Sequence, residues 1–161
     1  MRSAALLLAA ASLAGCASLA PKRLADCPGP LRSTREIAGD FVRQERIRVQ
    51  GRGVDEAFAL VIEKSGPRLM VLGLNAFGAK AFSLRQQDLA VESSSYLGRA
   101  LTVPPENVLR DLHRAYFLAP EEALASERSA TPASGGAIRV ASAACGYESI
   151  LVRVSEQIRS P

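Results

Sequence analysis

The stretch "EAFALVIEKSGPRLMVLGLN", Glu56 to Asn75, contains two strand-like segments on either side of a tight-turn signal. In the first segment Phe58, Leu60 and Ile62 recur at every second position, so they share one face of a strand. The triplet "SGP", 65–67, consists of residues that favour a turn. The second segment is apolar at nearly every position. The pattern predicts a β-hairpin.

The same pattern extends to both sides of this hairpin. Upstream, residues 41–50 are strand-like, and "GRG", 51–53, supplies a turn into the hairpin. Downstream, residues 79–86 and 87–93 give two more short strands. Five short strands separated by tight turns predict an antiparallel meander.

A helical pattern follows in "VPPENVLRDLHRAYF", 103–117. Its two prolines suit a helix start, and Glu106 lies where the helix dipole favours an acid. Pro120 ends this helix and begins a shorter helical piece. The apolar residues at helical spacing are Val108, Leu109, Leu112 and Tyr116.

The last part of the chain returns to strands. Residues 126–136 form a loop by composition, and residues 137–142 and 147–157 are strand-like. The order of strands, helices and strands predicts an α+β fold. We expect a curved antiparallel sheet, an incomplete half-barrel, with one or two helices packed on its concave face.

One face of this sheet is predicted to be continuously apolar. The residues assigned to it are Phe58, Leu60, Ile62, Leu72, Phe82, Leu84, Ile150, Val152 and Val154. Two interpretations stay open: the face packs against the helix and is filled, or it leaves an apolar cavity wide enough for an acyl chain. The candidate cavity residues are Phe58, Leu60, Ile62, Leu72, Phe82, Leu84, Leu112 and Tyr116.

The N-terminus has the pattern of an export signal. Arg2 precedes an apolar stretch of about twelve residues, which is shorter than the roughly 20 that a membrane-spanning helix needs. The stretch ends in "LAGC", 13–16, which resembles the lipobox of bacterial lipoproteins. The alternative is an ordinary cysteine buried in a helix.

The lipobox resemblance implies a processed and acylated protein. Residues 1–15 would be removed as a signal peptide, and Cys16 would carry three acyl chains such as palmitate, a firm membrane anchor. The following residue is Ala17, whereas an Asp at this position retains enteric-type lipoproteins in the inner membrane. The resemblance therefore implies attachment to the outer membrane, on its periplasmic face.

Removal of the signal leaves 161 − 15 = 146 residues, enough for one globular domain. We expect a tether at 16–40 and a single domain at 41–161. With Cys16 acylated, Cys27 and Cys145 remain, and two leftover cysteines in an oxidising compartment usually pair. Two separate buried thiols are the alternative.

Sequence signals for catalysis, metal binding and nucleic-acid binding are weak. The single histidine, His113, is two residues from Asp111, so the two do not face each other on a helix, and we expect His113 to be partly exposed. The chain has no C-x-x-C pair and no phosphate-binding loop, and its basic residues are scattered. We expect neither an enzyme nor a metal, cofactor or nucleic-acid partner.

The stretch "VLGLNAFGAKAFSLRQQDLAVESS", 71–94, and the proline-led helix after it resemble a known family. These are small uncharacterised bacterial lipoproteins that occur with aryl-polyene biosynthesis enzymes. The matching residues are Leu72, Gly73, Gly78, Phe82, Leu84, Pro105, Val108, Leu109, Asp111 and Leu112.

Through these residues the chain is distantly similar to the outer-membrane lipoprotein receptor and its periplasmic carrier. That likeness implies a half-barrel closed by helices over an acyl-binding cavity. The function expected first is to bind or pass on a lipid or lipid-linked molecule, for lipoprotein or glycolipid delivery. The alternative is an accessory lipoprotein of an envelope assembly, with a filled core and a protein partner.

Overall fold

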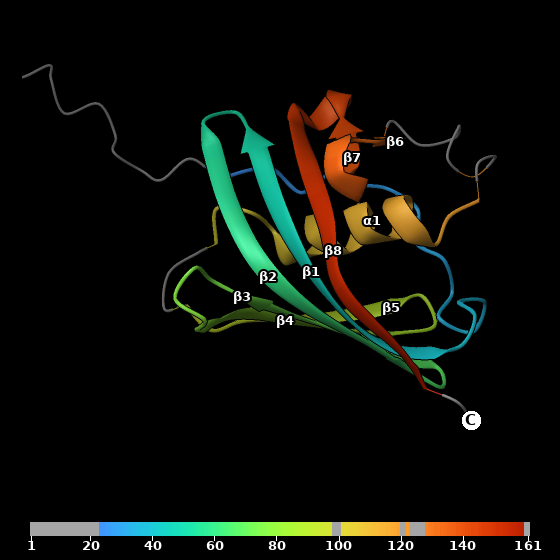
Figure 1. Cartoon of the computed structure of the whole chain (residues 1–161). Coiled ribbons are helices and arrows are strands. Elements are labelled where there is room, and N and C mark those ends of the chain that lie inside the picture. The colour runs from blue at the N-terminus through green and yellow to red at the C-terminus, as the bar shows by residue number, and fades with distance from the viewer. Residues whose placement is uncertain (1–22, 98–100, 120–121, 123–127, 160–161) are drawn as a thin grey trace, which may run out of the picture.

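The structure is a computed structural model that describes residues 23–97, 101–119, 122 and 128–159. Its strands form one antiparallel sheet with the order β5-β4-β3-β2-β1-β8-β7-β6 (Figure 1). The two edge strands, β5 and β6, do not pair with each other, so the sheet is not closed. The elements are β1 (Asp40–Gly51), β2 (Val54–Ser65), β3 (Arg68–Leu74), β4 (Lys80–Gln87), β5 (Ala90–Ser95), α1 (Pro105–Tyr116), β6 (Arg128–Pro132), β7 (Ile138–Ser142) and β8 (Tyr147–Arg159).

The predicted meander is present. Strands β1 to β5 follow one another in both sequence and sheet, and each pairs antiparallel with the next. The turn at 51–53 is composed of residues with positive φ, and Gly66 supplies the left-handed position of the β2–β3 turn. Local turn chemistry therefore determines the strand order in this half of the sheet.

Helix α1 lies on the concave side of the curved sheet (Figure 1). It contacts β4 near one edge of the sheet and β6 and β7 near the other. Pro105 occupies its first turn with Glu106, as the sequence predicted. The helix ends at Tyr116, and the next residue, Phe117, caps it by donating its N–H to the carbonyl oxygen of His113. The protein is mostly β-structure with a little helix, which fits the predicted curved sheet roughly.

Most of the predicted apolar face is correct. Five of its residues are buried in the core: Phe58, Leu60, Ile62, Phe82 and Leu84. Leu112 of α1 is buried in the same core. The residues that complete this inner face are Ile47, Val49, Leu69, Val71, Val140 and Leu151.

The prediction for Leu72 was wrong. Leu72 pairs with Val61 of β2 and lies on the outer face of the sheet, whereas Val71 pairs with Ile62 and lies inside. Periodicity could not decide the phase of β3, because this strand is apolar on both faces. Gly73 decides it, since a Cβ atom there would lie 2.3 Å from the ring of Phe82.

The Gly73→Ala substitution is therefore expected to destabilise the protein. The new methyl group would overlap the Phe82 ring, which is held edge-on against Phe58 with a centroid distance of 5.3 Å. Overpacking of this kind typically costs about 1–3 kcal/mol. Urea denaturation measures the loss, and Phe82→Leu added to Gly73→Ala should recover part of it. If the two substitutions changed the free energy of unfolding additively, overlap with the Phe82 ring would not explain the loss.

The predicted orientation of β8 was also wrong. Ile150 and Val152 face away from α1, because they pair with Arg48 and Arg46 on the outer face of β1, and Val152 and Val154 are exposed. Leu151 faces inward instead, because it pairs with the buried Ile47 of β1.

The inward orientation of Leu151 could not be predicted from the sequence, because polar residues occupy the neighbouring inward positions of β8. Ser149 Oγ donates to Asp111 Oδ2 of α1 at 2.6 Å, and Tyr147 Oη donates to Asp111 Oδ1 at 3.3 Å. These hydrogen bonds allow polar side chains to occupy inward positions of the strand.

Part of the predicted loop at 126–136 is a strand. Residues 128–132 form β6, which pairs with β7 through Arg128↔Ser142 to Pro132↔Ile138. The shorter helical piece expected from Pro120 lies outside the described residues except for Glu122, which is helical.

The segment before β1 packs on the domain over its described part. Leu24, Cys27, Thr34 and Ile37 are buried in the core or against it. Cys16, the signal peptide and tether residues up to 22 lie outside the described residues.

Candidate functional site

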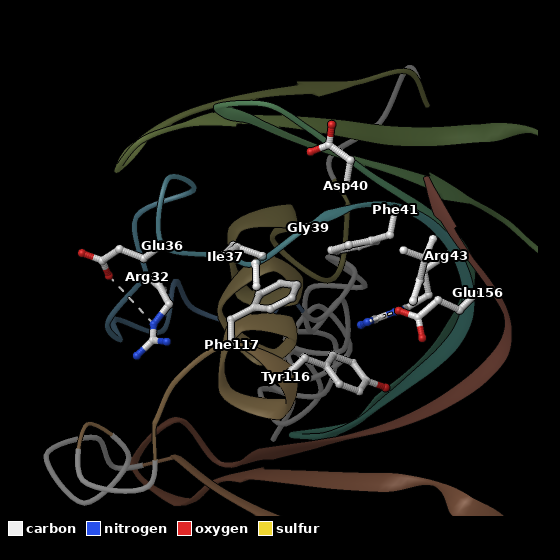
Figure 2. A pocket seen from close by; sticks show the side chains of 12 residues that line it. Arg32, Glu36, Ile37, Gly39, Asp40, Phe41, Arg43, Tyr116, Phe117 and Glu156 are labelled. Carbon is white, nitrogen blue, oxygen red and sulfur yellow. Dashed lines mark hydrogen bonds and ion pairs between the residues drawn. The ribbon is translucent and has the colours of Figure 1, made fainter. Parts of the chain in front are cut away.

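A pocket of about 430 Å³ opens at one end of the concave face, between β1, β8 and the C-terminal end of α1. We call it the β1–α1 pocket (Figure 2). Ile37, Phe41, Tyr116, Phe117 and Ile158 contribute apolar surface to its wall. Its charged or polar lining residues are Arg32, Glu36, Asp40, Arg43 and Glu156.

Arg43 is a buried cation in the wall of this pocket. Its Nη2 lies 2.5 Å from Glu156 Oε1, and its Nη1 lies 3.5 Å from Glu45 Oε1. The guanidinium carbon is 4.8 Å from the centroid of the Phe41 ring and 4.7 Å from that of Tyr116. Ion pairs and aromatic faces together hold this side chain in one place.

Glu45 lies deeper than Arg43 and its side chain is fully buried. Tyr116 Oη donates to Glu45 Oε2 at 2.9 Å, and Arg153 Nε is 4.0 Å from Oε1. Burial raises the pKa of Glu45, although the Tyr116 hydrogen bond and the Arg43 charge oppose the shift. The hydrogen bond and charge of Arg43 instead lower the pKa of Glu156.

Two strands place these charges on the inner face by different means. In β1, Phe41, Arg43, Glu45 and Ile47 alternate inward at period two. In β8 a bulge intervenes: Gln44 pairs with Ser155, but Glu45 pairs with Arg153, so Val154 is skipped. The extra residue reverses the alternation and allows both Arg153 and Glu156 to align with inward-facing residues of β1.

This group of charges was not predicted from the sequence. The period-two signal was present in β1, but two of its inward positions carry charges and so looked like solvent-facing residues. No pattern in β8 indicates the bulge. Of the predicted cavity residues, Tyr116 lines the β1–α1 pocket, and Phe58 lines a second pocket near the β3–β4 turn.

None of the other residues predicted to line a cavity lines either of these two pockets. Leu60, Ile62, Phe82, Leu84 and Leu112 are packed side by side in the core. Leu72 lies on the other face of the sheet. Five of the predicted cavity residues therefore belong to the packed core, and the β1–α1 pocket lies at one end of the concave face.

His113 is fully buried rather than partly exposed, which corrects the sequence prediction. Its Nδ1 accepts a hydrogen bond from the backbone N–H of Arg32 at 3.0 Å, and its Nε2 lies 2.7 Å from Gln86 Oε1. Gln86 Nε2 in turn donates to the carbonyl oxygens of Arg32 and Asp88. The neutral ring thus joins α1, β4 and the segment before β1.

This network predicts a loss of stability in acid. Burial and, to a lesser extent, the Arg32 charge lower the pKa of His113 from 6.5 to about 4. The unfolded chain therefore binds the proton first, so stability is present above pH 6.5 and falls as the pH drops towards 4. A pKa shift of this size lowers the free energy of unfolding by about 3 kcal/mol once the pH is below both pKa values.

Chemical denaturation between pH 7 and pH 4 measures this effect. His113→Gln is expected to be less stable at pH 7 and to lose less stability on acidification than the wild-type protein. Parallel pH profiles for the two proteins would show that His113 does not carry the effect.

Cys27 and Cys145 form a disulfide across 118 positions, consistent with the predicted pairing. Within the described residues there is no cluster of three or more His, Cys, Asp or Glu side chains that could hold a metal ion. In the same part of the chain, no helix is long and apolar enough to cross a membrane.

Comparison with known proteins assigns a family. The profile of a family described as "Protein of unknown function (DUF3261)" matches residues 42–145, which is more than half of the chain. A search of curated proteins found no significant match. The chain belongs to the DUF3261 family.

Proposed function

We propose that this DUF3261 protein is a lipoprotein anchored to the periplasmic face of the outer membrane, which binds the apolar part of a lipid or lipid-linked molecule. The observation that carries the proposal is the β1–α1 pocket. Its volume of about 430 Å³ lies within the range of small-molecule sites, and three aromatic rings contribute to its wall. The anchor rests on the "LAGC" pattern at 13–16.

The chemistry of the pocket suits an amphiphile. Phe117 and Ile158 offer surface to an apolar chain, while Arg32, Glu36 and Asp40 in the same wall offer partners to a polar head group. Arg32 Nε is buried without a hydrogen-bond partner, although it lies 4.0 Å from Glu36 Oε2. A head group that accepts a hydrogen bond could satisfy this nitrogen.

The family resemblance in sequence supports the same class of ligand. We propose that the protein works beside aryl-polyene biosynthesis enzymes and that its fold is related to the lipoprotein receptor and carrier half-barrels. The curved, unclosed sheet with α1 on its concave side supports the second part of this proposal.

A fluorescent fatty acid titrated into the protein without its anchor tests the binding function. Saturable binding is expected, and Ile158→Glu should weaken it about tenfold, since a lost contact worth 1.4 kcal/mol has this effect. Ile158 is 79% exposed, so the substitution leaves the core intact. Val154→Glu on the same strand lies outside the pocket lining and should bind like the wild-type protein.

A second function is favoured by the open edge of β8. Pairing between β7 and β8 stops at Ile138↔Leu151, so residues 152–159 pair with β1 alone among the described strands. Such an edge can accept a strand from another protein. If the fatty acid shows no saturable binding, the accessory function with a protein partner becomes the better proposal.

A further inference from the structure

Phe77 is the most exposed large apolar residue described, with 94% of its surface open to solvent. It lies in the turn between β3 and β4. Four hydrogen bonds hold this turn: Asn75 Oδ1 accepts from the N–H groups of Phe77 and Ala79, Asn75 N–H donates to Ala79 O, and Gly78 N–H donates to Asn75 O. The ring is therefore presented to solvent by an ordered turn.

Apolar surface continues from Phe77 into a pocket of about 480 Å³. Phe77 lines this pocket together with Phe58, Leu97 and Leu101. The acidic residues in its wall are already partnered, because Arg48 Nη2 is 2.7 Å from Asp55 Oδ2 and Thr102 Oγ1 donates to Glu56 Oε1 at 2.9 Å. The ion pair offsets the charge of Asp55 towards an anionic surface, whereas the hydrogen bond positions Glu56 without removing its charge.

Residues typical of a membrane interface lie beside the turn. Tyr96 is half exposed, and Lys80 Nζ lies 4.8 Å from the centroid of its ring. Aromatic and lysine side chains are enriched where proteins meet lipid head groups.

The N-terminal segment enters the fold at the same place. Leu24 N–H donates to the carbonyl oxygen of Thr102 at 2.8 Å, and Thr102 lines the pocket beside Phe77. Only seven residues, 17–23, separate Leu24 from Cys16. Even fully extended, this length of chain spans at most about 28 Å. An anchor at Cys16 would hold this end of the molecule near the bilayer.

We propose that the surface formed by Phe77, Lys80, Tyr96 and Leu97, here called the Phe77 face, lies against the membrane, with the Phe77 ring inserted among the lipids. This inference rests on the lipid anchor of the proposed function but not on the ligand of the β1–α1 pocket. The occupant of the face is the bilayer to which the chain itself is attached.

The chain contains no tryptophan, so Phe77→Trp provides a single fluorescent reporter. The full, acylated protein is placed on vesicles of phosphatidylethanolamine and phosphatidylglycerol that include a bromine-labelled lipid as quencher. Leu89→Trp is the matched control, because Leu89 is also exposed but lies in the β4–β5 turn, at the opposite end of β4 (Figure 1).

We expect Phe77→Trp to show a blue-shifted emission that the brominated lipid quenches, and Leu89→Trp to show neither effect. Absence of quenching at Phe77→Trp in protein that floats with the vesicles would overturn the inference, and so would equal quenching at both positions. Protein that fails to float would overturn the anchor and this inference together. The fatty-acid titration of Phe77→Trp reports on the β1–α1 pocket separately.

Discussion

Replacing Cys27 and Cys145 together with alanine is expected to lower the free energy of unfolding by about 4–5 kcal/mol. The bond closes a loop with a sequence separation of 118, and in the chain-entropy model a loop of this length restricts the unfolded chain by about that amount. It joins the segment before β1 to the turn before β8, which are far apart in sequence.

Urea denaturation of the double variant measures this loss. The native fold should persist, because Cys27 N–H still donates to Asn107 Oδ1 and Leu24 N–H to Thr102 O. Reduced wild-type protein is the matched control and should unfold at the same urea concentration as the variant. A variant as stable as the oxidised protein would contradict the prediction.

Arg43→Met is expected to cost about 3–5 kcal/mol, because it leaves the buried carboxylate of Glu45 without its nearest cation. Methionine keeps much of the apolar stem of the arginine, so lost charge rather than lost volume dominates. Arg153, at 4.0 Å and partly exposed, compensates only in part.

The pH dependence of stability shows whether the lost charge causes the destabilisation of Arg43→Met. Removal of Arg43 should raise the pKa of Glu45 further above its unfolded value, because the arginine charge now opposes the rise. A carboxyl group with a raised folded pKa contributes stability at low pH and loses it as the pH rises. Relative to the wild-type protein, Arg43→Met should therefore be least stable above neutral pH.

The Arg43→Met/Glu45→Gln double variant supplies the control. It removes both charges and should be more stable than Arg43→Met alone, with Tyr116 still able to donate to the amide oxygen. A double variant less stable than either single variant, with no change in pH profile, would mean that packing rather than charge explains the loss.

The sequence determined the parts of the fold that depend on local pattern. Alternation in 56–75 and the residues of two turns identified the β1–β3 meander, and the prolines at 104–105 with the apolar positions after them identified α1. The export signal, together with the assignment of Cys16 to the lipid anchor, predicted the Cys27–Cys145 pair. The strands, turns and helix follow from backbone propensity and from periodicity over a few residues, so they can be recognised without knowledge of distant contacts.

The tertiary structure alone decided which face of an ambiguous strand turns inward. Leu72 and Ile150 were assigned to the core because they are apolar, but pairing with neighbouring strands places both outside. Gly73 and Ser149 occupy inward positions instead. Gly73 is needed because the Phe82 ring fills its space, and Ser149 is tolerated because Asp111 accepts its hydrogen bond.

The candidate site depended on tertiary structure for the same reason. Arg43 and Glu45 are neighbours in β1, but their partners Arg153 and Glu156 reach the inner face only because β8 skips Val154. The one predicted cavity residue that lines the β1–α1 pocket, Tyr116, comes from α1, more than 70 positions after Glu45. A charge is stable inside a protein only beside its partner, and the distance between partners is fixed by strand register, which no local pattern in this sequence records.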